Sequence, residues 1–441
     1  MFDKGTLRSI LARHLEEYIF RPERQPAANL ERQVSLTPFL EQPEVIVVTG
    51  VRRCGKSTLV RHAARPYAQG RLLYLNFEDS RLTGFTLEDL ESSFDEFQLG
   101  RTASEPALLV YDEIQLVPNW ERWVSSFSDH PSIRVMITGS NSKMLSSELA
   151  TNLTGRHRQI YLTPLSLSEI VIPGSDAWPT NPQLRYAPIA EAARRKLFTQ
   201  LKTFGGFPCS FLSRDTSILN QYLEDILIKD IAVRHRVRNT AQLRALASVL
   251  TAQNGRLINK TKLAASAGIK DQATVTKFIG YFTQAYLFSE IRCFSNSRQQ
   301  QLKDKPKLYC VDPALANAAG FHLPDGDYWI LENLVLSELQ RRYKNCYFWH
   351  SSKNDYEVDF IVQTNDNKLL AFQVATDLAT PETVERELRA LESAKLELKI
   401  DKAYIVTGEP TPPSIISAIT EKATMKIEVI PFYNWALESK R

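Results

Sequence analysis

The pattern of apolar and polar positions divides this chain into an α/β part and several mixed segments. Uninterrupted apolar runs at residues 45–48 and 107–111 are typical of strands buried on both faces of a parallel sheet. A third run covers residues 134–138 and ends in polar residues. The first 170 residues therefore predict an α/β fold with a parallel sheet, and such folds bind ligands beyond the carboxyl ends of their strands.

The loop after the first apolar run fits the phosphate-loop pattern GxxxxGK[ST], with a strand before it and a helix after it. Its glycines allow backbone N–H groups to turn toward phosphate oxygens, an approach that Cβ atoms would block. Lys56 can reach the β and γ phosphates, and the Ser57 hydroxyl can bind Mg²⁺. We expect ATP and Mg²⁺ as ligands, with the nucleotide bound by Gly50, Val51, Arg52, Arg53, Cys54, Gly55, Lys56, Ser57 and Thr58.

Two carboxylates, Asp112 and Glu113, end the second apolar run. Such a pair is weak evidence alone, because solvated acids often follow a strand. Together with the phosphate loop it predicts hydrolysis. Asp112 would hold Mg²⁺, directly or through water, and Glu113 would act as general base toward the water that attacks the γ-phosphorus.

Further polar residues at the ends of strands are weaker candidates. Ser140 and Asn141 follow the third apolar run and could orient the attacking water or sense the γ-phosphate, although a strand-ending turn explains them equally well. The segment from Leu153 to Arg158 contains Arg156, which could serve as an arginine finger across a subunit boundary. An ordinary surface arginine is the alternative.

The rest of the chain predicts three further parts. Residues 171–238 form a linker with four prolines before residue 190, followed by a helical lid or bridge. Residues 239–327 have the pattern of a winged helix, and residues 328–441 alternate helix and strand in the order α-β-β-β-α-β. No internal repeat is evident.

The winged-helix pattern leaves DNA binding and protein binding open. One helix has an apolar face made of Leu243, Leu246, Ala247 and Leu250, and a second buries Val275, Phe278, Ile279 and Phe282 behind Asp271 as N-cap. In the DNA-binding interpretation, the second helix enters the major groove, and a loop with Arg298, Lys303, Lys305 and Lys307 follows the phosphates. Lys277 is the one basic residue of that helix, which argues for caution because winged helices also bind proteins.

The last part resembles the restriction-endonuclease-like fold. Glu332, Glu357 and Asp359 could gather a weak metal site, but an exposed acidic strand end in an interaction domain fits better. Nucleases of this fold need Glu-x-Lys on the next strand, where this chain has Gln373-Val374-Ala375. Glutamine brings no negative charge to a metal and alanine cannot replace an ammonium group, so we expect this domain to be catalytically inactive.

Taken in order, the motifs resemble those of bacterial and archaeal AAA-type ATPases that carry a C-terminal domain of uncharacterised role. The matching segments span nearly the whole chain: TGVRRCGKSTL, LLVYDEIQ, ITGSNSKMLSSELATNLTGR with LTPLSLSEI, YLEDILIKDIAVRHRV, KLYCVDPAL and DYEVDFIV. The resemblance implies an AAA-like core in which Lys56, Ser57, Asp112 and Glu113 have the roles described above. It also favours Arg156 as an intersubunit or sensor arginine.

Composition adds little about partners. A net charge of +4 over 441 residues permits nucleic acid binding without requiring it. Five cysteines lie far apart without a CxxC pair, which predicts a reducing, cytoplasmic environment and neither disulfides nor structural zinc. The chain has no apolar stretch of about 18 residues, so no membrane span is predicted.

The sequence thus predicts a Mg²⁺-dependent ATPase that couples ATP hydrolysis to a C-terminal module for DNA, RNA or a protein, and the chain could form a homo-oligomer. Three alternatives stay open: an ATP-regulated DNA nuclease, a slow ATP-binding switch, and a P-loop kinase for a small metabolite. The kinase is disfavoured because the large C-terminal region has no evident acceptor pocket.

Overall fold

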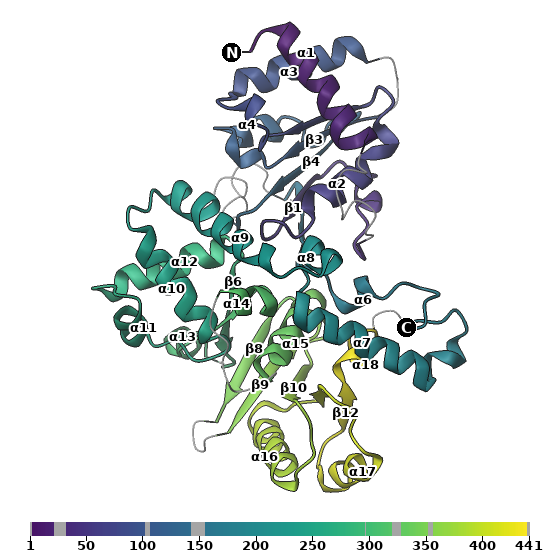
Figure 1. Ribbon diagram of the computed structural model, residues 1–441, viewed down its shortest axis with the longest axis vertical. Helices are drawn as coiled ribbons and strands as arrows, with labels where there is room; N and C mark the ends of the chain where they lie inside the picture. Colours follow the sequence, from purple (N-terminus) through teal and green to yellow (C-terminus); the bar gives the residue numbers. More distant parts are fainter. Residues whose placement is uncertain are drawn as a thin grey trace. The chain divides into compact units, whose positions relative to one another are not determined.

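The computed structural model describes residues 2–21, 32–101, 106–142, 155–295, 297–319, 328–351 and 356–438. Leu153 and Thr154 of the Arg156 segment lie outside the described residues. The chain separates into two compact units (Figure 1). Unit 1 comprises residues 1–164, 207–213 and 284–286, and unit 2 comprises residues 165–206, 214–283 and 287–441. The first boundary therefore falls six residues before the predicted one at 170.

Unit 1 contains a five-stranded sheet with the order β2-β3-β4-β1-β5, in which all neighbouring strands are parallel. The predicted strands are present, and every residue of β1, β2 and β3 is buried, because helices cover both faces of the sheet. The strands are β1 (Val45–Thr49), β2 (Leu72–Asn76), β3 (Ala107–Asp112), β4 (Ile133–Gly139) and β5 (His157–Tyr161).

The helices of unit 1 pack their apolar faces on this sheet. Leu7 and Ile10 of the N-terminal helix share one core with Val47 and Leu109 of the sheet. The helices are α1 (Lys4–His14), which continues into a wider turn at Leu15–Phe20, α2 (Lys56–Ala64), α3 (Leu87–Gly100), α4 (Trp120–Ser125) and α8 (Pro208–Ser213). Short 3₁₀ turns lie at Thr37–Phe39, Arg65–Tyr67, Ser80–Leu82 and Ile114–Leu116.

Unit 2 begins with helices, as the sequence predicts. Between α6 and α7 the described chain has a single short turn, Pro182–Tyr186, in agreement with a proline-rich linker. The two helices of the predicted winged helix bury the expected apolar faces, and Asp271 caps α12 by accepting from the Thr274 N–H at 2.7 Å. The helices are α6 (Leu167–Ile170), α7 (Pro188–Phe204), α9 (Ser217–Asp225) with a wider continuation at Ile226–Val233, α10 (Thr240–Ala252), α11 (Lys260–Ser266) and α12 (Gln272–Gln284).

A seven-stranded sheet with the order β12-β11-β10-β9-β8-β6-β7 forms the rest of unit 2. Strands from residues 239–327 and from residues 328–441 share this sheet, because β6 pairs in parallel with β8. That pairing covers an edge of β6 that would otherwise expose unpaired backbone groups. The strands are β6 (Phe288–Cys293), β7 (Lys307–Cys310), β8 (Cys346–His350), β9 (Glu357–Gln363), β10 (Leu369–Ala375), β11 (Lys402–Thr407) and β12 (Ile427–Pro431).

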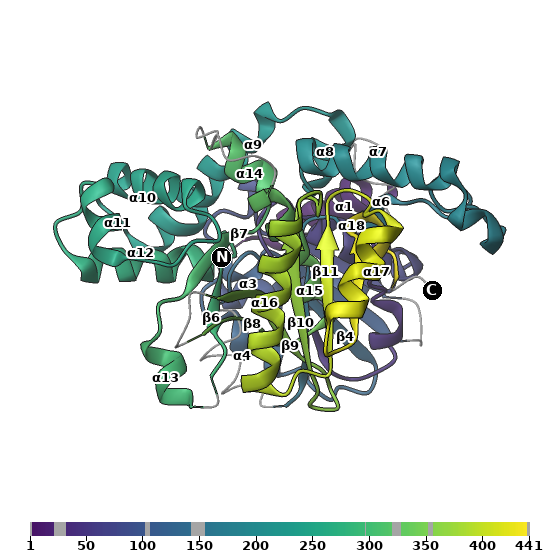
Figure 2. The same ribbon diagram turned by 90° about the horizontal axis from the view of Figure 1, so that it is seen from below.

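Helices cover this sheet and one replaces a predicted loop. Figure 2 shows α16 and α17 alongside strands β9 to β12, and Val384 and Leu391 of α16 share a core with Val358 and Ile405 of the sheet. The predicted basic loop between β6 and β7 contains the helix α13. The helices are α13 (Arg298–Lys303), α14 (Pro313–Ala318), α15 (Tyr328–Arg342), α16 (Pro381–Leu398), α17 (Pro413–Lys422) and α18 (Phe432–Trp435). Within the described ranges, no helix is both long enough and apolar enough to cross a bilayer.

Candidate nucleotide-binding site

The phosphate loop follows β1 and ends at α2, as predicted. Gly55 precedes α2 with φ 104°, a conformation that residues with a side chain rarely adopt. At Gly50, a Cβ atom would lie 2.1 Å from the Leu162 carbonyl oxygen, so a larger residue would displace the loop. Both glycines are therefore required by local geometry.

Arg32 holds this loop from outside the motif. Its Nη1 donates to the Cys54 carbonyl at 2.7 Å, and its Nη2 donates to the Thr163 carbonyl at 2.7 Å. The buried Cys54 thiol donates to the Leu162 carbonyl at 3.3 Å. These bonds fix the loop to the segment that follows β5.

Lys56 and Glu113 lie together at the carboxyl ends of β1 and β3. Lys56 Nζ donates to the carbonyls of Gly50 and Val51 at 3.1 and 3.2 Å, and lies 3.3 Å from Glu113 Oε1. Both side chains are buried. Since backbone carbonyls are weak partners for an ammonium group compared with phosphate oxygens, Lys56 is placed to exchange these contacts for a bound phosphate.

Glu113 has the geometry and the ionisation of a base. It adopts φ 55°, an uncommon conformation for a residue with a side chain, and its N–H donates to Thr138 Oγ1 at 2.9 Å. Burial raises the pKa of Glu113, but Lys56 and Arg52 outweigh burial and lower that pKa to about 2. The Glu113 carboxylate is therefore ionised near neutral pH.

Asp112 is fully buried and lies beside Ser57. Its Oδ1 accepts from Ser57 Oγ at 3.0 Å and from Thr138 Oγ1 at 2.5 Å, and its Oδ2 accepts from Tyr74 Oη at 2.8 Å. A hydroxyl and a carboxylate oxygen side by side are the hard donors that Mg²⁺ prefers when phosphates complete its shell. The residues at this edge of the sheet thus fit both ATP and Mg²⁺.

The weaker candidates occupy different places. Ser140 and Asn141 are buried directly after β4, at the same edge of the sheet as the phosphate loop. Arg156 lies just before β5 and pairs with Asp129 at 3.1 Å, with both side chains more than half exposed. Because β5 runs parallel to β1 and His157 aligns with Val45, Arg156 lies at the amino ends of the strands. Glu113 lies at their carboxyl ends. A sensor role within the same chain is therefore not supported, and a role toward a neighbouring subunit stays a prediction.

Motif reading missed several residues that contact the site: Arg32, Arg61, Tyr74, Gln115 and Thr138. One signal was available, because Ser57 and Arg61 are four residues apart on α2 and such pairs share a helix face. Tyr74 and Thr138 reach the site through the packing of β2 and β4 against β3, which no motif encodes.

The acidic residues of unit 2 that were predicted at an exposed strand end lie in a buried cluster. Glu332 and Asp359 are almost inaccessible to solvent, so their prediction as exposed residues is wrong. Lys307 is also buried, 3.8 Å from Glu332 and ion-paired with Glu357, so it does not belong to a phosphate-binding surface. In the parts of the chain that the structure describes, no three acidic, histidine or cysteine side chains group so as to hold a metal ion.

Hydrogen bonds inside this cluster satisfy its carboxylates. Glu332 accepts from Tyr309 Oη at 2.6 Å, and Asp359 accepts from Tyr328 Oη at 3.1 Å and from the Val374 N–H at 2.8 Å. Gln373, which stands where the endonuclease pattern needs a glutamate, donates to Glu387 at 2.6 Å. These contacts join α15, β9, β10 and α16.

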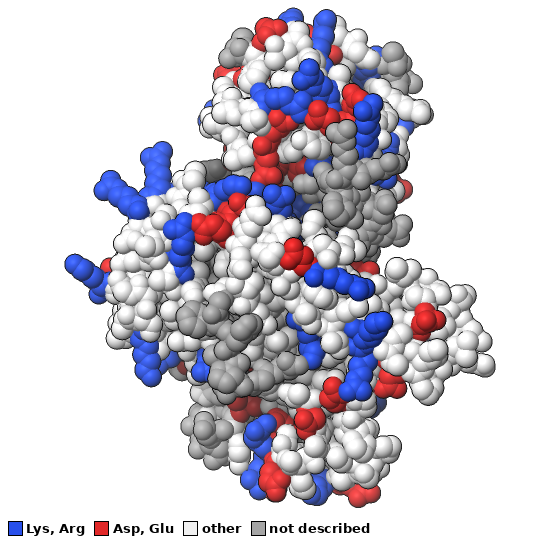
Figure 3. All heavy atoms as spheres, viewed as in Figure 1, with Lys and Arg blue, Asp and Glu red and all other residues white. Residues whose placement is uncertain are grey.

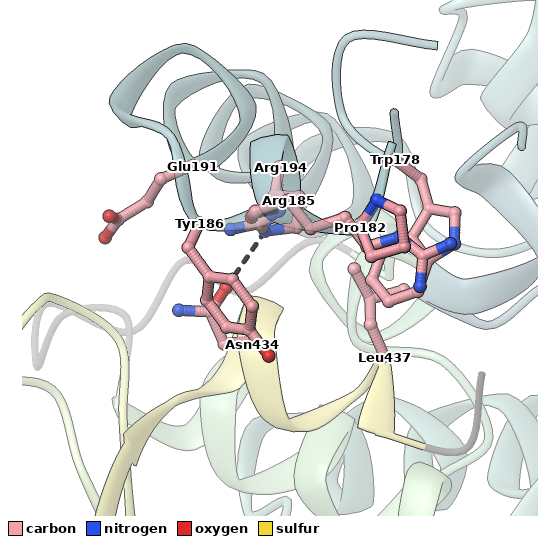
Figure 4. Close-up of a pocket in the computed structure, with 8 residues that line it drawn as sticks. All are labelled: Trp178, Pro182, Arg185, Tyr186, Glu191, Arg194, Asn434 and Leu437. Carbon is pink, nitrogen blue, oxygen red and sulfur yellow. Dashed lines mark hydrogen bonds between the residues drawn. The ribbon is translucent and has the colours of Figure 1, made fainter. Parts of the chain in front are cut away.

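A small cavity in unit 2 surrounds another buried cation, Arg194 (Figure 4). The Arg194 side chain donates to Asn434 Oδ1 at 2.9 Å and to the carbonyls of Ala177 and Arg185. The cavity volume is about 140 Å³, below the roughly 300 Å³ at which ligand pockets begin. The hydrogen bonds of Arg194 therefore connect the linker to α18. The cavity itself is too small for a metabolite.

Three known families match successive parts of the chain. Residues 42–171 match the AAA domain family, residues 195–325 match a domain of unknown function (DUF8612), and residues 329–425 match a second domain of unknown function (DUF4143). The AAA match contains the phosphate loop and both carboxylates.

Two solved structures show weak similarity to parts of this chain. One is the Aeropyrum pernix ORC1 protein in complex with DNA, 15% identical, covering 69% of this chain and 92% of that chain with a TM-score of 0.28. The other is C. elegans PCH-2, 15% identical, covering 50% of this chain and 63% of that chain with a TM-score of 0.29. At these scores neither similarity bears on what this chain does.

Two relatives match along most of the chain. An uncharacterised protein of Methanocaldococcus jannaschii is 30% identical over 421 residues, 93% of this chain and 91% of the relative. An uncharacterised protein of Haemophilus influenzae is 30% identical over 361 residues, 78% of this chain and 85% of the relative. Together with the phosphate loop and the parallel sheet, these matches show that the chain belongs to a family of AAA-type ATPases whose AAA domain precedes domains of unknown function.

Proposed function

We propose that the chain hydrolyses ATP to ADP and phosphate in a Mg²⁺-dependent reaction, and that it couples this reaction to a partner bound by its C-terminal half. One observation carries the proposal. At the carboxyl ends of the strands in unit 1, Lys56 lies 3.3 Å from Glu113, and Ser57 donates to Asp112 at 3.0 Å.

Each side chain has a distinct task in this reaction. The N–H groups of the phosphate loop and Lys56 bind the phosphates, while Ser57 and Asp112 would hold Mg²⁺, which neutralises phosphate charge. Glu113 orients a water molecule and accepts its proton as the water oxygen attacks the γ-phosphorus. When Lys56 moves from Glu113 to the phosphates, the Glu113 carboxylate loses its main ionic partner and its pKa rises, which makes it a better base.

Two further residues would complete the site. We propose that Asn141, buried at the end of β4, contacts the γ-phosphate or the attacking water. Arg156 would act on the site of a neighbouring subunit, since it is exposed and lies far from its own Glu113. This role implies a homo-oligomer in the ATP-bound state.

Charge distribution supports nucleic acid as the partner of the C-terminal half. Residues 239–310 contain eleven lysines and arginines but three acidic residues, whereas the rest of the chain has more acidic than basic residues. In Figure 3, basic side chains project from the edge where Figure 1 labels α10 to α12. A concentration of one charge on one module is the electrostatic feature of nucleic acid binding, although a protein partner fits the same fold.

A groove beside α12 provides a specific surface for this contact. It has a volume of about 590 Å³ and is lined by Gln272 and Thr276 of α12 and by basic residues of α11, β6, α13 and the segment after α13. The basic residues are Lys260, Arg292, Lys303 and Lys305. Glu290 and Asp304 also line the groove and would repel phosphates. A phosphate backbone would therefore lie along the side of the groove that carries the lysines.

The decisive experiment measures steady-state phosphate release by wild type and Lys56→Ala with single-stranded DNA, duplex DNA, RNA and no polymer. We expect Mg²⁺-dependent release well above that of Lys56→Ala, with stimulation by at least one polymer. Equal rates for the two proteins would refute hydrolysis and leave a binding switch. Hydrolysis without stimulation by any polymer would indicate a protein client.

The groove has its own test. The double variant Lys303→Ala/Lys305→Ala should weaken DNA binding and lower the slope of log affinity against log salt by about 2, as two phosphate contacts are lost. Lys399→Ala/Lys422→Ala removes the same charge elsewhere in unit 2 and should leave that slope unchanged. If both double variants change the slope equally, DNA does not bind in this groove.

A nuclease activity is the second candidate. The buried carboxylates of unit 2 are already held by Lys307, Tyr309 and Tyr328, which argues against a divalent cation there. Mg²⁺-dependent cleavage of DNA that survives Glu113→Gln and disappears in Asp359→Ala would reverse this conclusion. The cellular location is a further proposal: all five cysteines are unpaired, in agreement with a reducing cytoplasm.

A further inference from the structure

Asp112 receives hydrogen bonds from two different sides. Ser57 Oγ and Thr138 Oγ1 donate to Oδ1, while Tyr74 Oη donates to Oδ2 at 2.8 Å. The two oxygens therefore have separate surroundings. Oδ1 faces the hydroxyl that would share a metal with it, and Oδ2 faces the interior of unit 1.

Behind Oδ2, Tyr74 and Arg61 form a directed relay. Arg61 Nε donates to Tyr74 Oη at 2.8 Å, and Arg61 Nη2 lies 3.6 Å from Asp112 Oδ2. A guanidinium has no acceptor, so the Tyr74 oxygen must accept from Arg61 and give its own proton to Asp112. The relay thus has one possible direction, from Arg61 through Tyr74 to Asp112.

Tyr74 and Arg61 are both buried. Arg61 also lies over the ring of Tyr18, with 4.6 Å between the guanidinium carbon and the ring centre.

We propose that Tyr74 and Arg61 are positioning residues for the metal site: they fix the Asp112 carboxylate so that Oδ1 and Ser57 Oγ face a Mg²⁺–nucleotide complex together. The inference rests on the proposed function, because it assigns Mg²⁺ to Ser57 and Asp112. Both residues contact Asp112 and would act through it. Groups that orient a metal ligand in this way typically change metal affinity 10- to 100-fold, roughly, when they are removed.

Tyr74→Phe is the sharpest test, because it removes one oxygen and retains the packing of the ring. The affinity for a fluorescent ATP analogue is measured in EDTA and then across a MgCl₂ titration, and the unfolding temperature is measured in parallel. We expect an affinity in EDTA within about twofold of wild type, and a half-saturating Mg²⁺ concentration raised by roughly tenfold or more.

Tyr111→Phe is the matched control. Tyr111 is equally buried, directly precedes Asp112 on β3, and accepts from Trp123 Nε1 at 2.9 Å, outside the relay. Its variant should titrate with Mg²⁺ as wild type does. Arg61→Met provides a second test of the relay and should raise the Mg²⁺ requirement in the same direction as Tyr74→Phe.

The outcomes separate this inference from the proposed function. A folded Tyr74→Phe with the Mg²⁺ requirement of wild type would overturn the relay, as would an equal shift in Tyr111→Phe. A loss of affinity in EDTA that matches the loss in Mg²⁺ would also overturn it, because a general structural effect acts on both. Wild type that fails to bind the nucleotide at all would refute the proposed function instead.

Discussion

Each unit of this protein buries a lysine among carboxylates, and the two sites differ in which charge is in excess. In unit 1, Glu113 faces two cations, Lys56 and Arg52, and its pKa falls to about 2. In unit 2, Lys307 faces Glu332, Glu357 and Asp359. Burial raises the pKa of Glu332, and burial together with Glu332 raises the pKa of Asp359 well above its ordinary value.

This difference teaches that a buried Lys–Glu pair does not by itself indicate a reactive site. Lys56 is held partly by backbone carbonyls beside a loop of N–H donors, so a phosphate can replace its partners. The carboxylates around Lys307 are already satisfied by Tyr309, Tyr328 and backbone N–H groups. On the proposed function, the first cluster exchanges partners when a phosphate binds, whereas the carboxylates of the second already have hydrogen-bond partners.

The largest expected effect is on the rate of ATP hydrolysis and tests the role of Glu113 in unit 1. Glu113→Gln should lower the rate of ATP hydrolysis by roughly 10²–10⁴-fold, since an amide cannot accept a proton from water at neutral pH. Binding of the ATP analogue should be retained, because Lys56 loses a competing partner. Phosphate release and nucleotide affinity are measured together, and a hydrolysis rate equal to that of wild type would remove Glu113 from the mechanism.

The second prediction tests the cluster around Lys307 in unit 2. Lys307→Met should reduce the free energy of unfolding by about 1–3 kcal/mol, because Glu357 loses its ion-pair partner. Urea denaturation at pH 7 measures this change. Lys56→Met is the control: if unit 1 tolerates loss of its lysine at the same cost, the two clusters do not differ in the proposed way.

The pH dependence of stability should have opposite signs in the two units. Because the folded-state pKa of Glu332 lies above its ordinary value of 4.5, its stabilising effect is complete below pH 4.5 and is lost as the pH rises. The pKa of Glu113 lies below 4.5, so its effect is present above that pH and is lost as the pH falls toward 2.

Glu332→Gln should therefore flatten the decline in the free energy of unfolding above pH 4.5, by at most about 1.4 kcal/mol per pH unit for one group. Glu385→Gln, which removes a surface carboxylate paired with Arg389, should leave the decline as in wild type. A steeper decline in Glu332→Gln would mean that Glu332 is ionised in the folded state.

The smallest effect concerns a buried cation that has neutral partners. Asn434→Ala removes the oxygen that accepts from Arg194 Nε, and we expect a loss of about 1–2 kcal/mol in the free energy of unfolding. Asn434→Asp keeps an acceptor there and should recover most of the loss. If alanine and aspartate are equally destabilising, the hydrogen bond is not the cause.

The local motifs were predictable because their chemistry is contained in contiguous residues. A strand, a glycine loop and a lysine followed by a serine specify a phosphate-binding turn by themselves, and the apolar faces of α10 and α12 follow from helical spacing. The loss of Glu-x-Lys at Gln373 and Ala375 was visible in the same way. The order of the strands was predictable only as far as a parallel sheet.

Contacts between distant segments were decided by tertiary structure. Tyr74 and Arg61 reach Asp112 because β2 pairs with β3 and α2 packs on β3, and neither residue belongs to a nucleotide-binding motif. In the sequence, Lys307 looks like one more basic residue of a wing. In the structure, the pairing of β6 with β8 brings β7 and Lys307 near Glu357. The sequence by itself determined which groups can bind a nucleotide, because that chemistry is local. Which charges are buried together, and hence which carboxylate is ionised, was decided by the fold, because burial and long-range pairing depend on packing.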